Sequence, residues 1–84
     1  MEIIRLNNEE IDLLEEFKNL PLSDRINVSG LVCDLFKMLQ SENRPSQETI
    51  ATIISSAKHS KITRACYMAT LAGVDWGWGV TYSK

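Results

Sequence analysis

The apolar residues of this chain recur at helical spacing in four blocks, and short polar runs separate these blocks. Pro21 and the segment Asn43-Arg44-Pro45 form two of the breaks, because the residue before a proline is pushed out of the helical region. Lys58-His59-Ser60 forms the third, although one continuous helix over 47–72 is an alternative. The predicted helices cover residues 8–19, 24–42, 47–57 and 61–72.

Residues that favour helix ends stand at the boundaries of these blocks. Asn7 precedes the first block and Glu10 follows three positions later, which is the spacing of a capping box. The serines predicted to cap the remaining helices are Ser23, Ser46 and Ser60. Gly73 is predicted to end the last helix, because glycine readily adopts the left-handed conformation of a helix C-terminus.

The block at 24–42 is apolar on more than one face, which predicts a central helix covered on several sides. Gly30 in its interior costs about 1 kcal/mol relative to alanine, and we interpret it as the site of a close helix crossing. Over 75–82 large side chains alternate with small ones, which favours a strand paired with residues 2–6. The expected fold is mainly α: one domain over residues 1–84, with four helices and a short two-stranded element that the termini could form.

The composition indicates an ordinary globular protein, because 44% of the residues are apolar and 24% are charged. No apolar run approaches the ~20 residues that cross a bilayer, and the N-terminus has no signal-peptide pattern. Cys33 and Cys66 fall inside helical patterns, and we expect them to be buried and reduced. These features predict a cytoplasmic protein without a membrane partner.

The net charge of −2 is unevenly distributed along the chain. Residues 1–42 carry nine acidic and four basic side chains, whereas residues 43–84 carry two acidic and five basic ones. No acid lies between Thr49 and Val74, a stretch that contains Lys58, Lys61 and Arg64. Such asymmetry favours electrostatic steering of a partner protein or of a second copy, and we expect a homo-oligomer, such as a homodimer.

Both tryptophans and one of the two tyrosines lie within seven residues, as Trp76, Trp78 and Tyr82. Side chains of this size bury ~150–250 Å² each, so three exposed ones would form an apolar patch that monomers rarely tolerate. They are expected either to pack in the core or in a dimer contact, or to anchor a protein partner. The predicted partner-binding site consists of these aromatics with Glu9, Asp12 and Glu16 of the first helix as secondary contacts.

Residues 47–72 have the outline of a helix-turn-helix, which supports DNA binding as an alternative function. In this alternative Ser60, Lys61, Thr63 and Arg64 contact phosphates or base edges. The match is incomplete, because the turn contains no glycine and the few basic residues would neutralise far fewer than the ~6–10 phosphates of a firm binder. A helical hairpin with a solvated basic face explains the same pattern.

Catalytic and metal-binding chemistry have little support in the sequence. His59 is the only histidine and is expected in an exposed turn, and cysteines in apolar surroundings are poor nucleophiles. One histidine and two widely spaced cysteines match no zinc site. The acidic residues of the first helix lack the glycine turn of a calcium loop. We therefore expect a non-enzymatic protein without metal or cofactor.

The first helical block and the residues after it follow a recognisable order. An acidic start, a double leucine and an aromatic come first, and an arginine then opens the next helix. The residues are Glu9-Glu10-Ile11-Asp12-Leu13-Leu14-Glu15-Glu16-Phe17-Lys18-Asn19-Leu20, then Pro21, Ser23, Asp24 and Arg25. Over residues 9–35 this pattern resembles the helical segment that follows the DNA-binding domain in phage-type repressors. The resemblance implies a phage or prophage setting and packing between protomers. Because the helix-turn-helix that precedes this segment in that family is missing here, the expected function is a small accessory regulator that binds and modulates another protein, such as an antirepressor or an inhibitor of a host system.

Overall fold

The computed structural model describes residues 6–76, which form four α-helices. The helices are α1 (Asn8–Lys18), α2 (Leu22–Gln40), α3 (Gln47–Ser55) and α4 (Ser60–Leu71). The mainly α, four-helix prediction is confirmed, and so is the break between the third and fourth helices. Residues 6–76 contain no strand, so the two-stranded element is not supported; most of its predicted residues, 2–5 and 77–82, lie outside the described part.

Side-chain hydrogen bonds define the beginnings of α1 and α3. The predicted capping box is present at α1, where the Glu10 N–H donates to Asn7 Oδ1 at 2.8 Å and the Asn7 N–H donates to Glu10 Oε1 at 3.0 Å. Ser46 caps α3 as predicted, because its Oγ accepts from the Thr49 N–H at 3.1 Å. Both helices therefore begin where the local sequence indicates.

The predicted caps of the other two helices are wrong. α2 begins at Leu22, so Ser23 lies inside the helix and Pro21 occupies the cap position. The proline ring holds φ at −55°, a nearly helical value, and the chain enters the helix directly behind it. Ser60 is the first residue of α4, and His59 stands at the cap without a side-chain capping bond.

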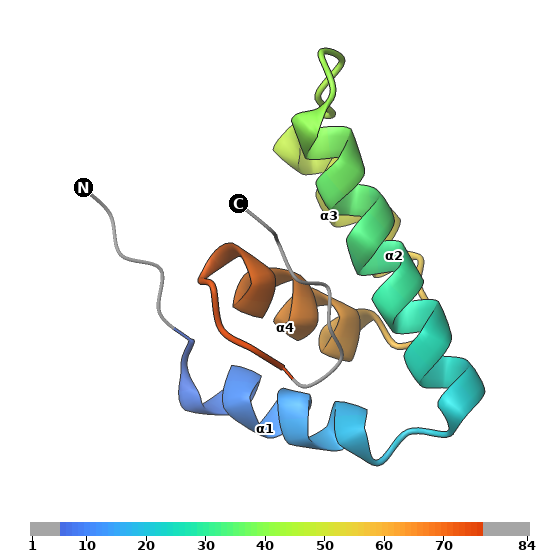
Figure 1. Ribbon diagram of the computed structural model, residues 1–84, viewed down its shortest axis with the longest axis vertical. Helices are drawn as coiled ribbons and strands as arrows, with labels where there is room; N and C mark the ends of the chain where they lie inside the picture. The colour runs from blue at the N-terminus through green and yellow to red at the C-terminus, as the bar shows by residue number, and fades with distance from the viewer. Residues whose placement is uncertain (1–5, 77–84) are drawn as a thin grey trace.

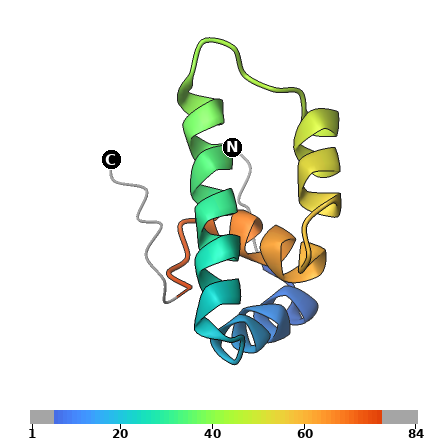
Figure 2. The same ribbon diagram turned by 90° about the vertical axis from the view of Figure 1, so that its right-hand side faces the viewer.

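The fourth helix is the centre of the fold, and it contacts α1, α2 and α3. Figures 1 and 2 show α2 and α3 standing side by side. α4 crosses below α3 and against the lower half of α2, and α1 lies beneath α4. The prediction of a central second helix is therefore wrong. Small buried residues, Ala65, Cys66 and Ala69, let the neighbouring helices approach α4 closely, whereas α2 leaves Leu22 and Ile26 more than half exposed.

Gly30 lies on the exposed side of α2, so its interpretation as a close helix crossing is wrong. A Cβ atom added at this position would meet no other atom within 4 Å. The glycine is therefore not required by any close packing within the described residues. No helix in this part of the chain, including the 19-residue α2, is long and apolar enough to span a membrane.

The core consists of two clusters that meet at one side chain. The larger cluster joins α1, α2, α4 and the segment after α4, and it contains Phe17, Val32, Phe36 and Trp76. The smaller cluster, Leu35, Ile50 and Ile54, joins α2 to α3. Tyr67 packs against both clusters and meets the Phe36 ring edge-on at a centroid distance of 5.3 Å.

A left-handed glycine reverses the chain at the end of α4, as predicted. Gly73 has φ of +74°. Its N–H donates to the Thr70 carbonyl at 3.1 Å, and the Val74 N–H donates to the Ala69 carbonyl at 2.8 Å. This pair of bonds is a Schellman motif. The reversal turns the following residues back toward the helix, and Trp76 thereby reaches the core.

Candidate functional site

Trp76 is a core residue and not an exposed anchor, which corrects its assignment to a partner-binding site. Its side chain is 3% exposed and meets the Phe17 ring edge-on at a centroid distance of 5.0 Å. The indole Nε1–H donates to Thr70 Oγ1 at 2.9 Å, and that hydroxyl donates to the Cys66 carbonyl at 2.9 Å. The only polar atom of the indole is therefore satisfied inside the domain. Trp78 and Tyr82 lie outside the described residues.

The acidic residues that were predicted as secondary contacts are accessible. Glu9, Asp12 and Glu16 are all exposed, and their spacing places them along one face of α1. A negatively charged strip of this kind can steer a basic partner but supplies little apolar surface for binding.

The residues of the DNA-binding alternative do not form one surface. Lys61 and Arg64 are exposed and Ser60 is half-buried, but Thr63 is completely buried. The reason is the central position of α4, which turns the Thr63 side of the helix into the interior. The assignment of Thr63 as a DNA contact is therefore wrong.

An apolar groove between α3 and α4 is the feature that sequence reasoning missed. It has a volume of about 420 Å³, and we call it the α3/α4 groove. Its apolar lining comes from both helices, as Ile50, Ala51, Ile54, Tyr67, Met68 and Leu71. Gln47, Ser55 and Arg64 complete its lining, so Arg64 is its one charged residue. The sequence signal was the spacing of Arg64, Met68 and Leu71, at i, i+4 and i+7 on one stripe of a helix.

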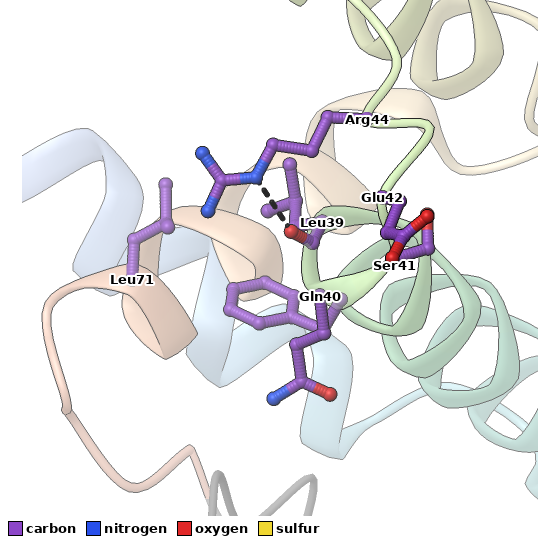
Figure 3. Close-up of a pocket in the computed structure, with 7 residues that line it drawn as sticks. Leu39, Gln40, Ser41, Glu42, Arg44 and Leu71 are labelled. Atoms are coloured by element: carbon purple, nitrogen blue, oxygen red, sulfur yellow. Dashed lines mark hydrogen bonds between the residues drawn. The ribbon is translucent and has the colours of Figure 1, made fainter.

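A second hollow, which we call the α2 hollow, adjoins this groove at the end of α2 (Figure 3). Its volume is about 480 Å³, and Leu71 lines both spaces. The Arg44 Nε–H donates to the Leu39 carbonyl at 2.8 Å, which places a cation over the last turn of α2. Glu42 also lines the hollow. The two spaces thus share Leu71, and each has one arginine in its lining, Arg64 in the groove and Arg44 in the α2 hollow.

The two cysteines and the histidine lie in different surroundings. Burial raises the pKa of the Cys66 thiol to about 12, so it stays protonated near neutral pH. Cys33 is only partly buried, which corrects the expectation that both cysteines are buried. His59 is partly buried and its Nε2 lies 3.2 Å from Asp24 Oδ2, so it is not the freely exposed residue that was expected.

Within residues 6–76 no three histidine, cysteine or acidic side chains gather closely enough to hold a metal ion.

Comparison with known proteins adds no relative to this description. No family model, no curated protein and no solved structure matches the chain.

Proposed function

We propose that this chain is a non-enzymatic protein-binding module, and that its α3/α4 groove takes an amphipathic helix of a partner protein. The observation that carries the proposal is the groove itself, an apolar space between two helices whose lining includes Arg64 and no acid. Partner helices bind such grooves with apolar residues spaced at i, i+3 or i+4, and i+7. This spacing matches the turns that separate Arg64, Met68 and Leu71 along α4.

The charge of the surface selects the chemistry of the partner helix. No acid lies between Thr49 and Val74. Arg64 lines the groove and is exposed, and Lys61, one helical turn earlier on α4, is also exposed. Arginine binds carboxylates with two parallel hydrogen bonds and is frequent among the residues that dominate interface energy. The partner helix is therefore apolar on the face that enters the groove and acidic on its flank.

The proposed phage or prophage setting rests on the resemblance of residues 9–35 to a segment of phage-type repressors, and the groove does not bear on it. In this setting the proposed function is that of an accessory regulator in the cytoplasm, such as an antirepressor or an inhibitor of a host system. Regulators of this kind are small proteins that act by binding another protein. Self-association belongs to the same proposal, because the acidic strip of α1 complements the basic side of α4 in a second copy.

DNA binding is the weaker alternative. The three exposed cations of this segment, Lys58, Lys61 and Arg64, can neutralise about three phosphates, whereas a firm binder makes ~6–10 such contacts. The burial of Thr63 also removes a contact that could read a base edge. We therefore expect no salt-dependent shift of duplex DNA by this chain at physiological ionic strength.

The test uses two helical peptides that share one leucine face and differ only in their flank, which is glutamate in one and lysine in the other. Titration into the isotope-labelled protein, followed by amide chemical shifts, is expected to perturb residues of α3 and α4. The glutamate peptide should bind at least about tenfold more tightly, which is about 1.4 kcal/mol. Equal binding of the two peptides would refute the electrostatic selection, and no binding of either would refute the groove.

A pair of variants locates the contact on the protein. Met68→Glu places a charge inside the groove and should abolish binding of the glutamate peptide. Ile26→Glu changes an apolar side chain that is 52% exposed on α2, away from the groove, and should leave binding unchanged. Equal effects of the two substitutions would show that the peptide does not use the groove.

A further inference from the structure

Two large apolar side chains are exposed together where α1 meets the segment after α4. Ile11 is 47% exposed and Val74 is 41% exposed, and both line one hollow of about 500 Å³. Glu15, one turn after Ile11, lines the same hollow, and Asp12 is exposed as well. We call Ile11, Asp12, Glu15 and Val74 the α1 patch. It is apolar at its centre and has acids on its flank.

Helix α4 separates the α1 patch from the α3/α4 groove. Three buried residues of α4 belong to the core cluster that includes α1, namely Ile62, Cys66 and Ala69. Arg64, Met68 and Leu71 line the groove instead. At about 3.6 residues per turn these two sets lie on opposite sides of α4. Figures 1 and 2 show the same arrangement, with α1 beneath α4 and α3 above it. The patch and the groove are therefore two different surfaces on different sides of the molecule.

The charges of the two surfaces are complementary. Lys61 and Arg64 are exposed and lie three positions apart on α4, and Asp12 and Glu15 have the same separation on α1. Side chains three positions apart on a helix lie ~5–6 Å from each other, so two helices that pack side by side can pair both acids with both bases. Glu15 forms a salt bridge with Lys18 at 3.3 Å, but both side chains are more than half exposed, and such pairs are weak enough to rearrange.

We infer that the α3/α4 groove takes the α1 patch of a second copy of this chain. Ile11 and Val74 of one copy enter the apolar groove of the next, and Asp12 and Glu15 lie beside Arg64. The inference rests on the proposed function, because it names an occupant of the same groove. Since the two surfaces differ and lie on different sides, the contact is head-to-tail. The assembly is therefore a chain or a ring of more than two copies, and not a two-fold dimer.

The self-contact controls access to the groove. Two partly exposed apolar side chains bury less surface than the whole apolar face of a partner helix, so the self-contact is the weaker of the two. Its ion pairs are also screened by salt. A partner helix with an acidic flank therefore displaces the second copy, and self-association covers the groove only while no partner is present.

The test is sedimentation velocity of the full chain at concentrations up to about 1 mM. The mean mass of the parent should rise beyond that of a dimer, and the association constant should fall at least about tenfold between about 0.05 M and 0.5 M salt. Ile11→Lys should be monomeric. Ile26→Lys, at a side chain of α2 that is 52% exposed, is the matched control and should associate like the parent. A monomeric parent, an assembly that stops at a dimer, or equal effects of the two substitutions would overturn the inference.

A mixture of two blocked variants tests the head-to-tail geometry. Met68→Lys blocks the groove and Ile11→Lys blocks the patch, so each variant alone should be monomeric with an unchanged circular dichroism spectrum. An equimolar mixture should form a dimer and nothing larger, because only the patch of the first and the groove of the second are intact. A mixture that stays monomeric would contradict the inference.

The helical peptide with the glutamate flank distinguishes this inference from the proposed function. At saturation it should convert the parent assembly to monomers. If the parent is monomeric and the peptide still binds the groove, the self-contact fails and the proposed function stands. If the assembly forms and the peptide does not bind, the proposed function fails instead. An assembly that persists while the peptide fills the groove would show that the second copy binds elsewhere.

Discussion

Replacing Trp76 by alanine is the strongest test of the fold, because this residue closes the larger core cluster from outside the helices. The side chain is 3% exposed, packs edge-on against Phe17 and donates its N–H to Thr70. Burying an indole of ~150–250 Å² at ~25 cal/mol per Å² contributes about 4–6 kcal/mol. Substitution of a buried tryptophan by alanine typically costs about 3–5 kcal/mol, which agrees with this figure.

This loss is large compared with the stability of a small domain. At roughly 0.05–0.15 kcal/mol per residue, 84 residues have a free energy of unfolding of about 4–13 kcal/mol. Each kcal/mol corresponds to about 4–8 °C in Tm for a domain of this size, so Trp76→Ala should lower Tm by at least about 12 °C. The variant is therefore expected to be partly unfolded at 37 °C.

The assay is urea and thermal unfolding followed by far-ultraviolet circular dichroism. Val74→Ala is the matched control: this residue lies two positions earlier and is 41% exposed, so its change should be within about 0.5 kcal/mol. If Trp76→Ala unfolds at the same urea concentration as Val74→Ala, Trp76 is not a core residue and the assignment fails.

A double-mutant cycle isolates the indole hydrogen bond. Trp76→Phe keeps an aromatic ring and removes the N–H, and Thr70→Val removes the acceptor. Their coupling energy is expected to be about 1 kcal/mol. A coupling near zero would mean that packing alone holds the indole.

Three further predictions follow from single positions. Gly30→Ala should raise the free energy of unfolding by about 0.5–1 kcal/mol, because the added methyl meets no other atom at this exposed helical site. Gly73→Ala should lower the free energy of unfolding by about 1–2 kcal/mol, because φ at this position is +74°. Urea unfolding of both variants checks these opposite signs. Thr63→Val should be more stable than the parent in the same assay by about 1 kcal/mol, since it removes an unpaired buried hydroxyl; a less stable variant would contradict this reasoning. Burial raises the pKa of Cys66 from 9.0 to about 12, so the unfolded chain loses this proton at a lower pH than the folded protein does. The free energy of unfolding should therefore fall between pH 9 and 12, by up to about 1.4 kcal/mol per pH unit. Comparison of urea midpoints with Cys66→Ala, which should lose this part of the alkaline decline, checks that sign.

The helices themselves could be predicted from the sequence because their signals are local. Asn7 and Glu10 form the capping box that their spacing indicates, Ser46 caps α3, and Gly73 ends α4. Each of these contacts joins residues within about one helical turn, so neighbours in the sequence suffice to identify them. Two local predictions failed: α2 begins directly after Pro21, before the predicted serine cap, and α4 begins at Ser60 itself, with His59 at the cap position.

The candidate sites could not be located in this way. The α3/α4 groove depends on how α3 and α4 cross, and the contact between Asp24 and His59 depends on α2 lying beside the beginning of α4. Residues far apart in the sequence take part in each: Asp24 and His59 are 35 positions apart. A single-sequence pattern contains no information on such a pairing.

The order of the helices, their turns and their apolar stripes are thus properties of the chain read along its length. Which stripe is buried, and by which neighbour, is decided only when the helices pack. Apolar content favoured a central α2, yet the small side chains of α4 allow closer approach, and close packing outweighs the number of large apolar residues. Helix packing also buries Trp76 and Thr63, so that Thr63 cannot contact DNA. The burial of a residue depends on all of the elements around it.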